Sequence, residues 1–232
     1  MSDQARYRLP RTVVPRRYDL VLEPDLQAGT FSGSEDVQVE VRERVDEIVL
    51  NAADLEITSG RLERDGERLA VADIAIEDET ERARLRLEVA AEPGEWTLHL
   101  EFRGVLSDRM RGFYRSTDDG EDGARHVIAT TQFESTDARR AFPCWDEPDM
   151  KAVFGVTLVV DDGLLAISNG PEVERAAAGD RVRVRFADTM PMSTYLVAFI
   201  VGPMEATEPV DVDGVPLRVV YPIGKGHLTA YG

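Results

Sequence analysis

The sequence is short of cysteine and lysine, and each shortage excludes something. Cys144 is the only cysteine among 232 residues, so no disulfide can form within the chain. Lys151 and Lys225 are the only lysines, and the other members of the 27 basic residues are arginine. Against 44 acidic residues they leave a formal net charge of −17. This balance argues against non-specific binding to nucleic acid or to an anionic membrane.

Long apolar runs are lacking as well. The longest one, near residues 195–201, is too short to cross a bilayer, and the first residues do not show the pattern of a secretory signal. We therefore expect a cytoplasmic protein. The acidic, lysine-poor composition predicts a halophilic source. An ordinary acidic protein from a GC-rich genome is the alternative, and a salt titration separates the two.

Histidine is scarce, and the motifs of common catalytic sites do not occur. His99, His126 and His227 lie far apart in the sequence, and there is no His-Glu-x-x-His. We also find no Gly-x-Ser-x-Gly and no glycine-rich phosphate loop. Cys144 has no sequence sign of activation, so we interpret it as a buried structural cysteine. We therefore predict no catalytic residue, metal ligand or cofactor site in this chain.

Short stretches with alternating polar and apolar residues make up most of the chain. The alternation is clear in residues 37–41, 82–89, 96–102 and 153–160, and turn signals recur roughly every ten residues. This pattern predicts an all-β fold, with a large, mostly antiparallel sheet or sandwich. No amphipathic helix of ordinary length, no repeat and no internal linker is evident.

Three local predictions refine this pattern. Asp65-Gly66 is typical of a tight hairpin turn. Residues 194–201 are nearly continuously apolar, which favours a central buried strand. Residues 214–221 read as the last strand, and the residues after them resemble the first turn of a new helix. The chain therefore looks like a part of something longer.

Residues 130–154 combine aromatic and charged side chains more densely than the rest of the chain. Gln132 and Glu134 are two residues apart, so in a strand they share one face, while Phe133 points the other way into the core. An amide and a carboxylate side by side can hold a protonated amine. A solvated, exposed strand edge is the alternative.

The other charges of this stretch read as structural. We expect Asp137 to pair with Arg139 or Arg140. Asp146 and Glu147 precede a proline, and their carboxylates could accept backbone N–H groups in a turn. The aromatic residues, including Phe142 and Trp145, would hold the loop to the core.

The chain resembles the N-terminal domain of the aminopeptidase N family of zinc metallopeptidases, closest to its puromycin-sensitive and tricorn-interacting branch. Residues 131–148 carry the main likeness, and they read Thr-Gln-Phe-Glu-Ser-Thr-Asp-Ala-Arg-Arg-Ala-Phe-Pro-Cys-Trp-Asp-Glu-Pro. Further matches follow in the expected order over nearly the whole chain: Leu9-Pro10, Pro15, Tyr18-Asp19-Leu20, Phe31-Ser32-Gly33, residues 110–116, Ile167-Ser168-Asn169 and residues 192–199.

The resemblance implies a saddle-shaped, mostly antiparallel β domain that packs against a thermolysin-like catalytic domain. It also implies that Glu134 helps to bind the free α-amino group of a peptide substrate and that Gln132 lines the first side-chain pocket. The family's Gly-Ala-Met-Glu-Asn and His-Glu-x-x-His do not occur in this chain. Zinc, its ligands and the general base would therefore belong to a catalytic domain that this chain lacks.

These implications divide the chain into an N-terminal β domain (residues 1–222) and the start of a crossover to the catalytic domain (residues 223–232). The full-length protein would be a zinc aminopeptidase that removes N-terminal residues from peptides, and this chain alone would be inactive. A stand-alone, non-catalytic β-sandwich that binds another molecule is the alternative. An exposed apolar patch, where the catalytic domain would dock, favours the first reading.

Overall fold

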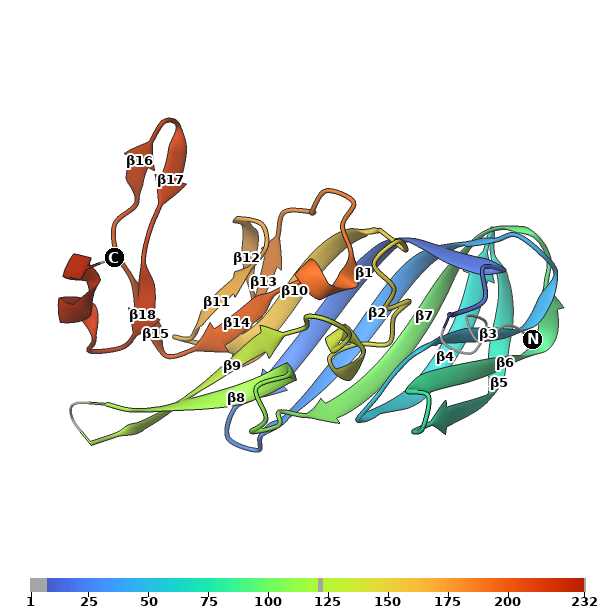
Figure 1. The fold of residues 1–232 in the computed structure, drawn as a ribbon, viewed down its shortest axis with the longest axis horizontal. Coiled ribbons are helices and arrows are strands. Elements are labelled where there is room, and N and C mark those ends of the chain that lie inside the picture. Colours follow the sequence, from blue (N-terminus) through green and yellow to red (C-terminus); the bar gives the residue numbers. More distant parts are fainter. Residues whose placement is uncertain (1–7, 121–122, 232) are drawn as a thin grey trace.

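The computed structural model describes residues 8–120 and 123–231, and strands dominate them (Figure 1). The largest sheet is 10-stranded, with the spatial order β12 (Glu172–Ala178), β13 (Arg181–Phe186), β10 (Val153–Asp161), β1 (Val13–Asp25), β2 (Thr30–Val41), β7 (Gly94–Val105), β4 (Leu55–Arg64), β5 (Glu67–Glu77), β6 (Arg82–Ala91) and β3 (Val45–Asn51).

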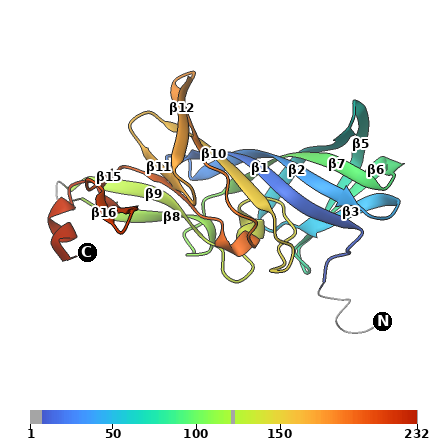
Figure 2. The same cartoon turned by 90° about the horizontal axis from the view of Figure 1, so that it is seen from above.

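A 4-stranded sheet packs beside the large one (Figures 1 and 2). Its order is β11 (Leu165–Ser168), β14 (Phe199–Gly202), β9 (Arg125–Gln132) and β8 (Gly112–Asp119). Two 2-stranded sheets follow, β15 (Met204–Ala206) with β18 (Val220–Pro222) and β16 (Val210–Val212) with β17 (Val215–Leu217). Short 3₁₀ helices are η1 (Ala138–Arg140), η2 (Thr194–Leu196) and η3 (Gly226–Tyr231).

The predicted all-β, mostly antiparallel fold is confirmed. Among the strand pairs of the described residues, β1 and β10 are the parallel exception, with Tyr18 beside Phe154 in the register. In that same part of the chain, no helix has both the length and the apolar character needed to cross a membrane.

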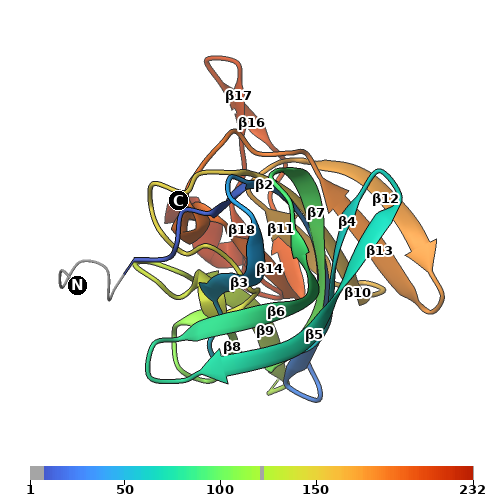
Figure 3. The same ribbon diagram turned by 90° about the vertical axis from the view of Figure 1, so that its right-hand side faces the viewer.

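Alternation along the strands decides which side chains enter the core. In β2, Val37, Val39 and Val41 are buried while the residues between them are more exposed. The strand β5 joins two parts of the large sheet, since its first residues pair with β4 and its later residues pair with β6. The register shifts between Val71 and Asp73, and Figure 3 shows the sheet curling over at this end.

The hairpin turn predicted at Asp65-Gly66 is confirmed. Both residues have positive φ, 50° for Asp65 and 85° for Gly66, and they join β4 to β5. Two consecutive positive φ angles are typical of a turn whose twist matches that of the flanking strands. Asp and Gly are two of the few residues that tolerate this conformation, which is why the sequence signal was reliable.

The strand predicted over residues 194–201 is wrong in its first half. Thr194–Leu196 forms η2, and β14 begins only at Phe199. The hydroxyl of Thr194 donates a hydrogen bond to Asp146 Oδ1 at 2.5 Å, and the N–H of Val197 donates to the carbonyl of Thr194 at 3.0 Å. These contacts curl the backbone, and an apolar run alone does not reveal them.

The last predicted strand, residues 214–221, is also wrong as a single element. It divides into β17 and β18, which belong to different sheets. The strand β12, which the sequence analysis missed, has almost entirely exposed side chains, so it lacks the apolar alternation that marks a strand. Both β12 and β17 lie where there is little core to impose a pattern.

The C-terminal part of the described chain extends away from the two main sheets (Figure 1). The β16–β17 hairpin carries Val210, Val212, Val215 and Leu217, which are between 47% and 64% exposed. Val210 lies opposite Leu217 and Val212 opposite Val215, so the four side chains share one face of the hairpin. The division at residues 222 and 223 falls between β18 and η3 and stays a prediction.

Candidate functional site

Gln132 is the last residue of β9, and Glu134 lies two residues beyond it. Both side chains are exposed, whereas Phe133 between them is only 2% exposed. The ring of Phe133 makes edge contacts with Phe142 and Phe199, at centroid distances of 6.1 and 5.8 Å. The buried aromatic side chain therefore anchors the strand end while its two polar neighbours face outward.

A tight turn follows at once. The N–H of Asp137 donates to the carbonyl of Phe133 at 2.9 Å, which closes the loop that presents Glu134 and leads into η1. The peptide bond between Glu134 and Ser135 is cis. The loop is short and hydrogen-bonded, so Glu134 sits on a defined support.

Arg140 fixes the far end of this loop. Its Nε donates to Asp137 Oδ1 at 2.7 Å, and its other nitrogens bind Asp54 and Glu81. Gly112, which pairs with Gln132 across β8 and β9, has a φ of 68°, and a Cβ there would lie 2.7 Å from Arg140 Cβ. Glycine at this position therefore permits the loop to pack against β8.

Arg139 and Asp146 form a half-buried ion pair beneath the loop. Arg139 Nε lies 3.0 Å from Asp146 Oδ2, and the Asp146 side chain is only 1% exposed. The N–H of Asp146 also donates to Asn51 Oδ1 at 3.2 Å. Of the two partners predicted for Asp137, Arg140 is the one observed, while Arg139 pairs with Asp146 and Glu81.

Glu147 accepts a backbone hydrogen bond, but the donor is Leu9, 138 positions away, and not an N–H of the turn itself. Its Oε1 lies 2.5 Å from the nitrogen of Leu9, and its Oε2 lies 2.9 Å from Arg8 Nη1 and 3.1 Å from Arg11 Nη2. The carboxylate thus ties the start of the described chain to the loop that follows Trp145. Asp146 and Glu147 have structural partners and are not free for chemistry.

Cys144 is fully buried, which confirms its interpretation as a structural residue. Burial raises the pKa of its thiol well above the usual range, so the sulfur stays protonated and unreactive. Tyr18 is buried as well, and its hydroxyl accepts a hydrogen bond from the N–H of Trp145 at 3.2 Å. Burial also raises the pKa of the Tyr18 hydroxyl.

Glu35 is a buried acid that the sequence analysis missed. It is 2% exposed, and neither carboxyl oxygen has a hydrogen-bond partner among the described residues. Burial raises the pKa of its carboxyl group well above the ordinary value, so the group is held neutral. The signal was present, because Glu35 stands in register with Phe31 and Val37 on the core face of β2.

Gln132 and Glu134 contrast with these satisfied groups. Neither side chain makes a hydrogen bond or an ion pair with any other residue that the structure describes. An unpaired carboxylate and an amide at one strand end leave their acceptors free for an external group with N–H donors, such as an ammonium. The roles predicted for Gln132 and Glu134 stay predictions.

A metal ion does not fit the described part of this chain. Nowhere in residues 8–120 and 123–231 do three His, Cys, Asp or Glu side chains lie close enough together to hold one. His99 is occupied by a contact to Asp36 on the sheet surface. No hydrolytic step can therefore be derived through a metal in this chain.

Comparison with known proteins shows that the chain is similar to one protein family. The model of the peptidase M1 N-terminal domain matches residues 14–196. Aminopeptidase M1-A of Oryza sativa is 44% identical over 222 residues, and Aminopeptidase M1 of Arabidopsis thaliana is 41% identical over 222 residues. The puromycin-sensitive aminopeptidase of Caenorhabditis elegans is 38% identical over 227 residues.

These matches cover nearly all of this chain but only a part of each relative. They span 94% of the chain for the two plant proteins and 97% for the nematode protein. The same alignments span 25% of each plant protein and 24% of the nematode one. The chain thus has about a quarter of the length of the relatives it matches.

Proposed function

Because the chain belongs to the peptidase M1 N-terminal domain family, we propose that it is the substrate-anchoring domain of a zinc-dependent aminopeptidase. The whole protein would remove N-terminal residues from peptides, as the names of its relatives suggest. This chain would contribute binding and orientation, and its contribution would come from the strand end at Gln132 and Glu134.

Glu134 would bind the α-ammonium group of the peptide, and Gln132 would line the pocket of the first side chain. The observation that carries this proposal is the free carboxylate of Glu134, which has no partner among the described residues although arginine is abundant in the chain. An ammonium group would donate a charge-assisted hydrogen bond to this carboxylate and so give it a partner. The buried ring of Phe133 and the closed turn to Asp137 keep this carboxylate in place.

Zinc would be held by residues of a catalytic domain outside this chain, since the described residues do not fit a metal ion. When bound there, zinc would activate the attacking water. The 232-residue chain alone should not hydrolyse peptides. Hydrolysis of an amino-acid anilide by the purified chain, retained after a chelator wash, would contradict this part of the proposal.

The exposed apolar face of the β16–β17 hairpin supports a partner domain. Val210, Val212, Val215 and Leu217 lie together on a two-stranded hairpin that projects from the main sheets (Figure 1). An isolated hairpin of this kind is marginal in water, and apolar patches of this kind mark interfaces. This favours a docked catalytic domain over a stand-alone binding protein. The cytoplasmic location stays a prediction.

The test is Glu134→Ala in the full-length protein. Loss of a hydrogen bond to a charged group costs about 1.5–3 kcal/mol, so kcat/KM for a free-amine dipeptide should fall roughly 10-fold to 100-fold. The matched control is Glu88→Ala, because Glu88 is an exposed glutamate of β6 without a partner among the described residues. A specificity constant unchanged by Glu134→Ala would remove Glu134 from the binding site.

A further inference from the structure

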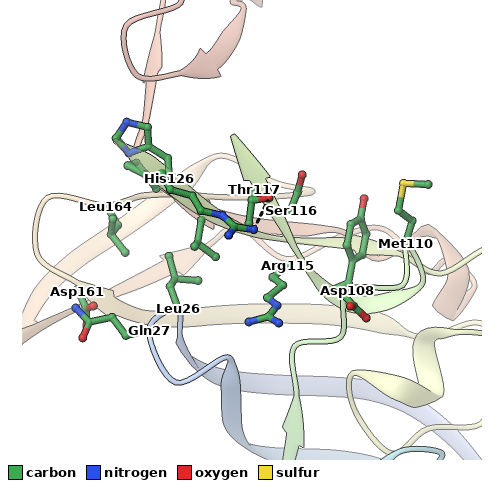
Figure 4. Close-up of a pocket in the computed structure, with 14 residues that line it drawn as sticks. Leu26, Gln27, Asp108, Met110, Arg115, Ser116, Thr117, His126, Asp161 and Leu164 are labelled. Atoms are coloured by element: carbon green, nitrogen blue, oxygen red, sulfur yellow. Dashed lines mark hydrogen bonds between the residues drawn. The ribbon is translucent and has the colours of Figure 1, made fainter. Parts of the chain in front are cut away.

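A hollow of about 790 Å³ lies beside the β8–β9 hairpin, at the end of β9 opposite to Gln132 (Figure 4). One wall consists of β8 and β9 residues that include Arg115, Thr117 and Arg125. The other wall comes from the turn after β1, with Leu26, and from the turn after β10, with Leu164. The volume is in the range of small-molecule and short-peptide sites.

Two guanidinium groups line this hollow without a carboxylate partner among residues 8–120 and 123–231. Arg115 makes no side-chain hydrogen bond or ion pair with any residue that the structure describes. Arg125 makes one hydrogen bond, from Nη2 to Thr117 Oγ1 at 3.4 Å. Elsewhere in the chain arginine commonly pairs with an acid, as Arg103 does with Glu56 at 2.7 Å. Each free guanidinium keeps most of its five N–H donors.

The register places both arginines on one face of the hairpin. Arg115 pairs with Ala129 and Thr117 with Val127, so these residues share a face with Arg125. On this face Ala129 is buried and Val127 half-buried, whereas Arg115, Thr117 and Arg125 are exposed. The bond from Arg125 to Thr117 draws the second guanidinium back toward the first. The two arginines line one hollow, so an anion there could contact both positive charges.

No acidic residue that the structure describes forms an ion pair with either arginine, although Asp119 lies directly opposite Arg125 in the register. Asp161 is engaged elsewhere, with its Oδ1 3.2 Å from Arg181 Nε. Asp108 lies close to Arg115 in Figure 4, since the N–H of Arg115 donates to the carbonyl of Ser107 at 2.8 Å, but the Asp108 carboxylate makes no ion pair with a described residue. In a chain of net charge −17, a site with two unpaired cations is electrostatically distinct from its surroundings.

Apolar side chains complete the lining. Leu26 and Leu164 are half-buried and pack against the core, and Val127 lines the hollow as well. A bare inorganic anion would not use these contacts. A ligand that has carboxylates next to apolar groups would use both.

We propose that this hollow binds an acidic peptide segment, with its carboxylates on Arg115 and Arg125 and an apolar side chain against Leu26 and Leu164. Bidentate guanidinium–carboxylate pairs give such a site its orientation. Arg125 is far from Glu134, since Arg125 and Gln132 are the two ends of β9, roughly 20 Å apart at about 3.3 Å per residue. Arg115 lies opposite Ala129 and is nearer to Gln132, but alternation places Ala129 and Gln132 on opposite faces of β9. Binding in the hollow does not depend on the proposed aminopeptidase role.

The test is fluorescence anisotropy with the 232-residue chain and a dye-labelled, N-acetylated hexapeptide that alternates leucine and glutamate. Acetylation removes the α-ammonium, so binding at Glu134 does not contribute. Arg115→Gln and Arg125→Gln should each raise Kd at least about 5-fold, and Arg115→Lys should recover a part of that loss. Arg86→Gln is the matched control, because Arg86 is an exposed arginine of β6 without an ion pair among the described residues.

Three outcomes would overturn the proposal. Arg86→Gln could weaken peptide binding as much as Arg115→Gln does, or Glu134→Gln could weaken it. A peptide with glutamine in place of glutamate could also bind with the same affinity as the acidic peptide. Displacement of the peptide by inorganic phosphate at comparable concentration would show a general anion site and would also overturn the proposal. Circular dichroism and thermal unfolding of each variant show whether it is folded, and Arg115→Lys keeps the test decisive if Arg115→Gln does not fold.

Discussion

Glu35 is an acidic residue that the alternation of β2 places on the core face of the sheet. Its register in β2 turns the carboxyl group into the core, next to Tyr18 and Cys144, where it is 2% exposed and without a partner in the described structure. A neutral carboxyl group is tolerated there, but a charged one would lack both water and a counter-ion. Stability should therefore depend on the pH at which the carboxyl group loses its proton.

The sign of this dependence follows from the direction of the shift. Burial raises the pKa of Glu35 in the folded chain above its ordinary value of 4.5, so the folded chain holds the proton more tightly than the unfolded one. The stabilisation is complete below pH 4.5 and is lost as pH rises from there toward the folded pKa. The loss can reach about 1.4 kcal/mol per pH unit.

Glu35→Gln should remove this dependence. The free energy of unfolding, measured with urea, should fall with rising pH above 4.5 in the wild type and should fall less in the variant. Glu88→Gln, which changes an exposed glutamate of β6, is the control and should run parallel to the wild type. If the free energy of unfolding changed with pH in the same way for Glu35→Gln and for the wild type, the carboxyl group of Glu35 would not be held neutral.

Asp146 is the second residue whose environment predicts a large effect. Its side chain is 1% exposed and binds Arg139 and Thr194. Asp146→Ala would remove one of the two acids that bind Arg139 and would leave the buried Thr194 hydroxyl without its acceptor, so it should lower the free energy of unfolding by about 3–5 kcal/mol. Asp149→Ala should cost less than about 1 kcal/mol, because that carboxylate is 58% exposed. Equal urea midpoints for the two variants would contradict this.

At the scale of elements, the sequence was reliable where alternation or turn chemistry was strong. The strands β2, β6, β7 and β10 were predicted because they alternate, and Asp65-Gly66 was predicted because few residues accept its backbone angles. The prediction from sequence failed at residues 194–201, where the contact of Thr194 with Asp146 bends the chain. That contact joins residues 48 positions apart, which no local pattern encodes.

The β16–β17 hairpin should be the least stable element of the isolated chain. Its apolar side chains are exposed, and it is two strands wide. In amide hydrogen exchange its amides should be labelled at the shortest times, while β1 and β10 stay protected because their core residues are buried. The full-length protein should protect the hairpin. Equal protection of the hairpin with and without the rest of the protein would contradict a docked domain there.

The whole chain carries a large excess of negative charge, and this excess decides how salt should act on its stability. A net charge of −17 favours expansion by self-repulsion, which salt screens. Salt also weakens surface ion pairs, but exposed pairs such as Arg44–Glu92 contribute little. The thermal midpoint should therefore rise as KCl increases from dilute buffer to molar concentration. Full stability in dilute buffer, with no gain from salt, would count against a halophilic source.

The sequence by itself determined the all-β class, the family resemblance, the core face of the alternating strands and the exposed pair Gln132 and Glu134. These features depend on neighbouring residues, through period-2 alternation and turn chemistry. Tertiary structure alone decided the pairing of Arg139 with Asp146 and the break before β14. It also decided that Arg115, Leu26 and Leu164 line the same hollow. Those features join distant parts of the chain, so only packing brings them together.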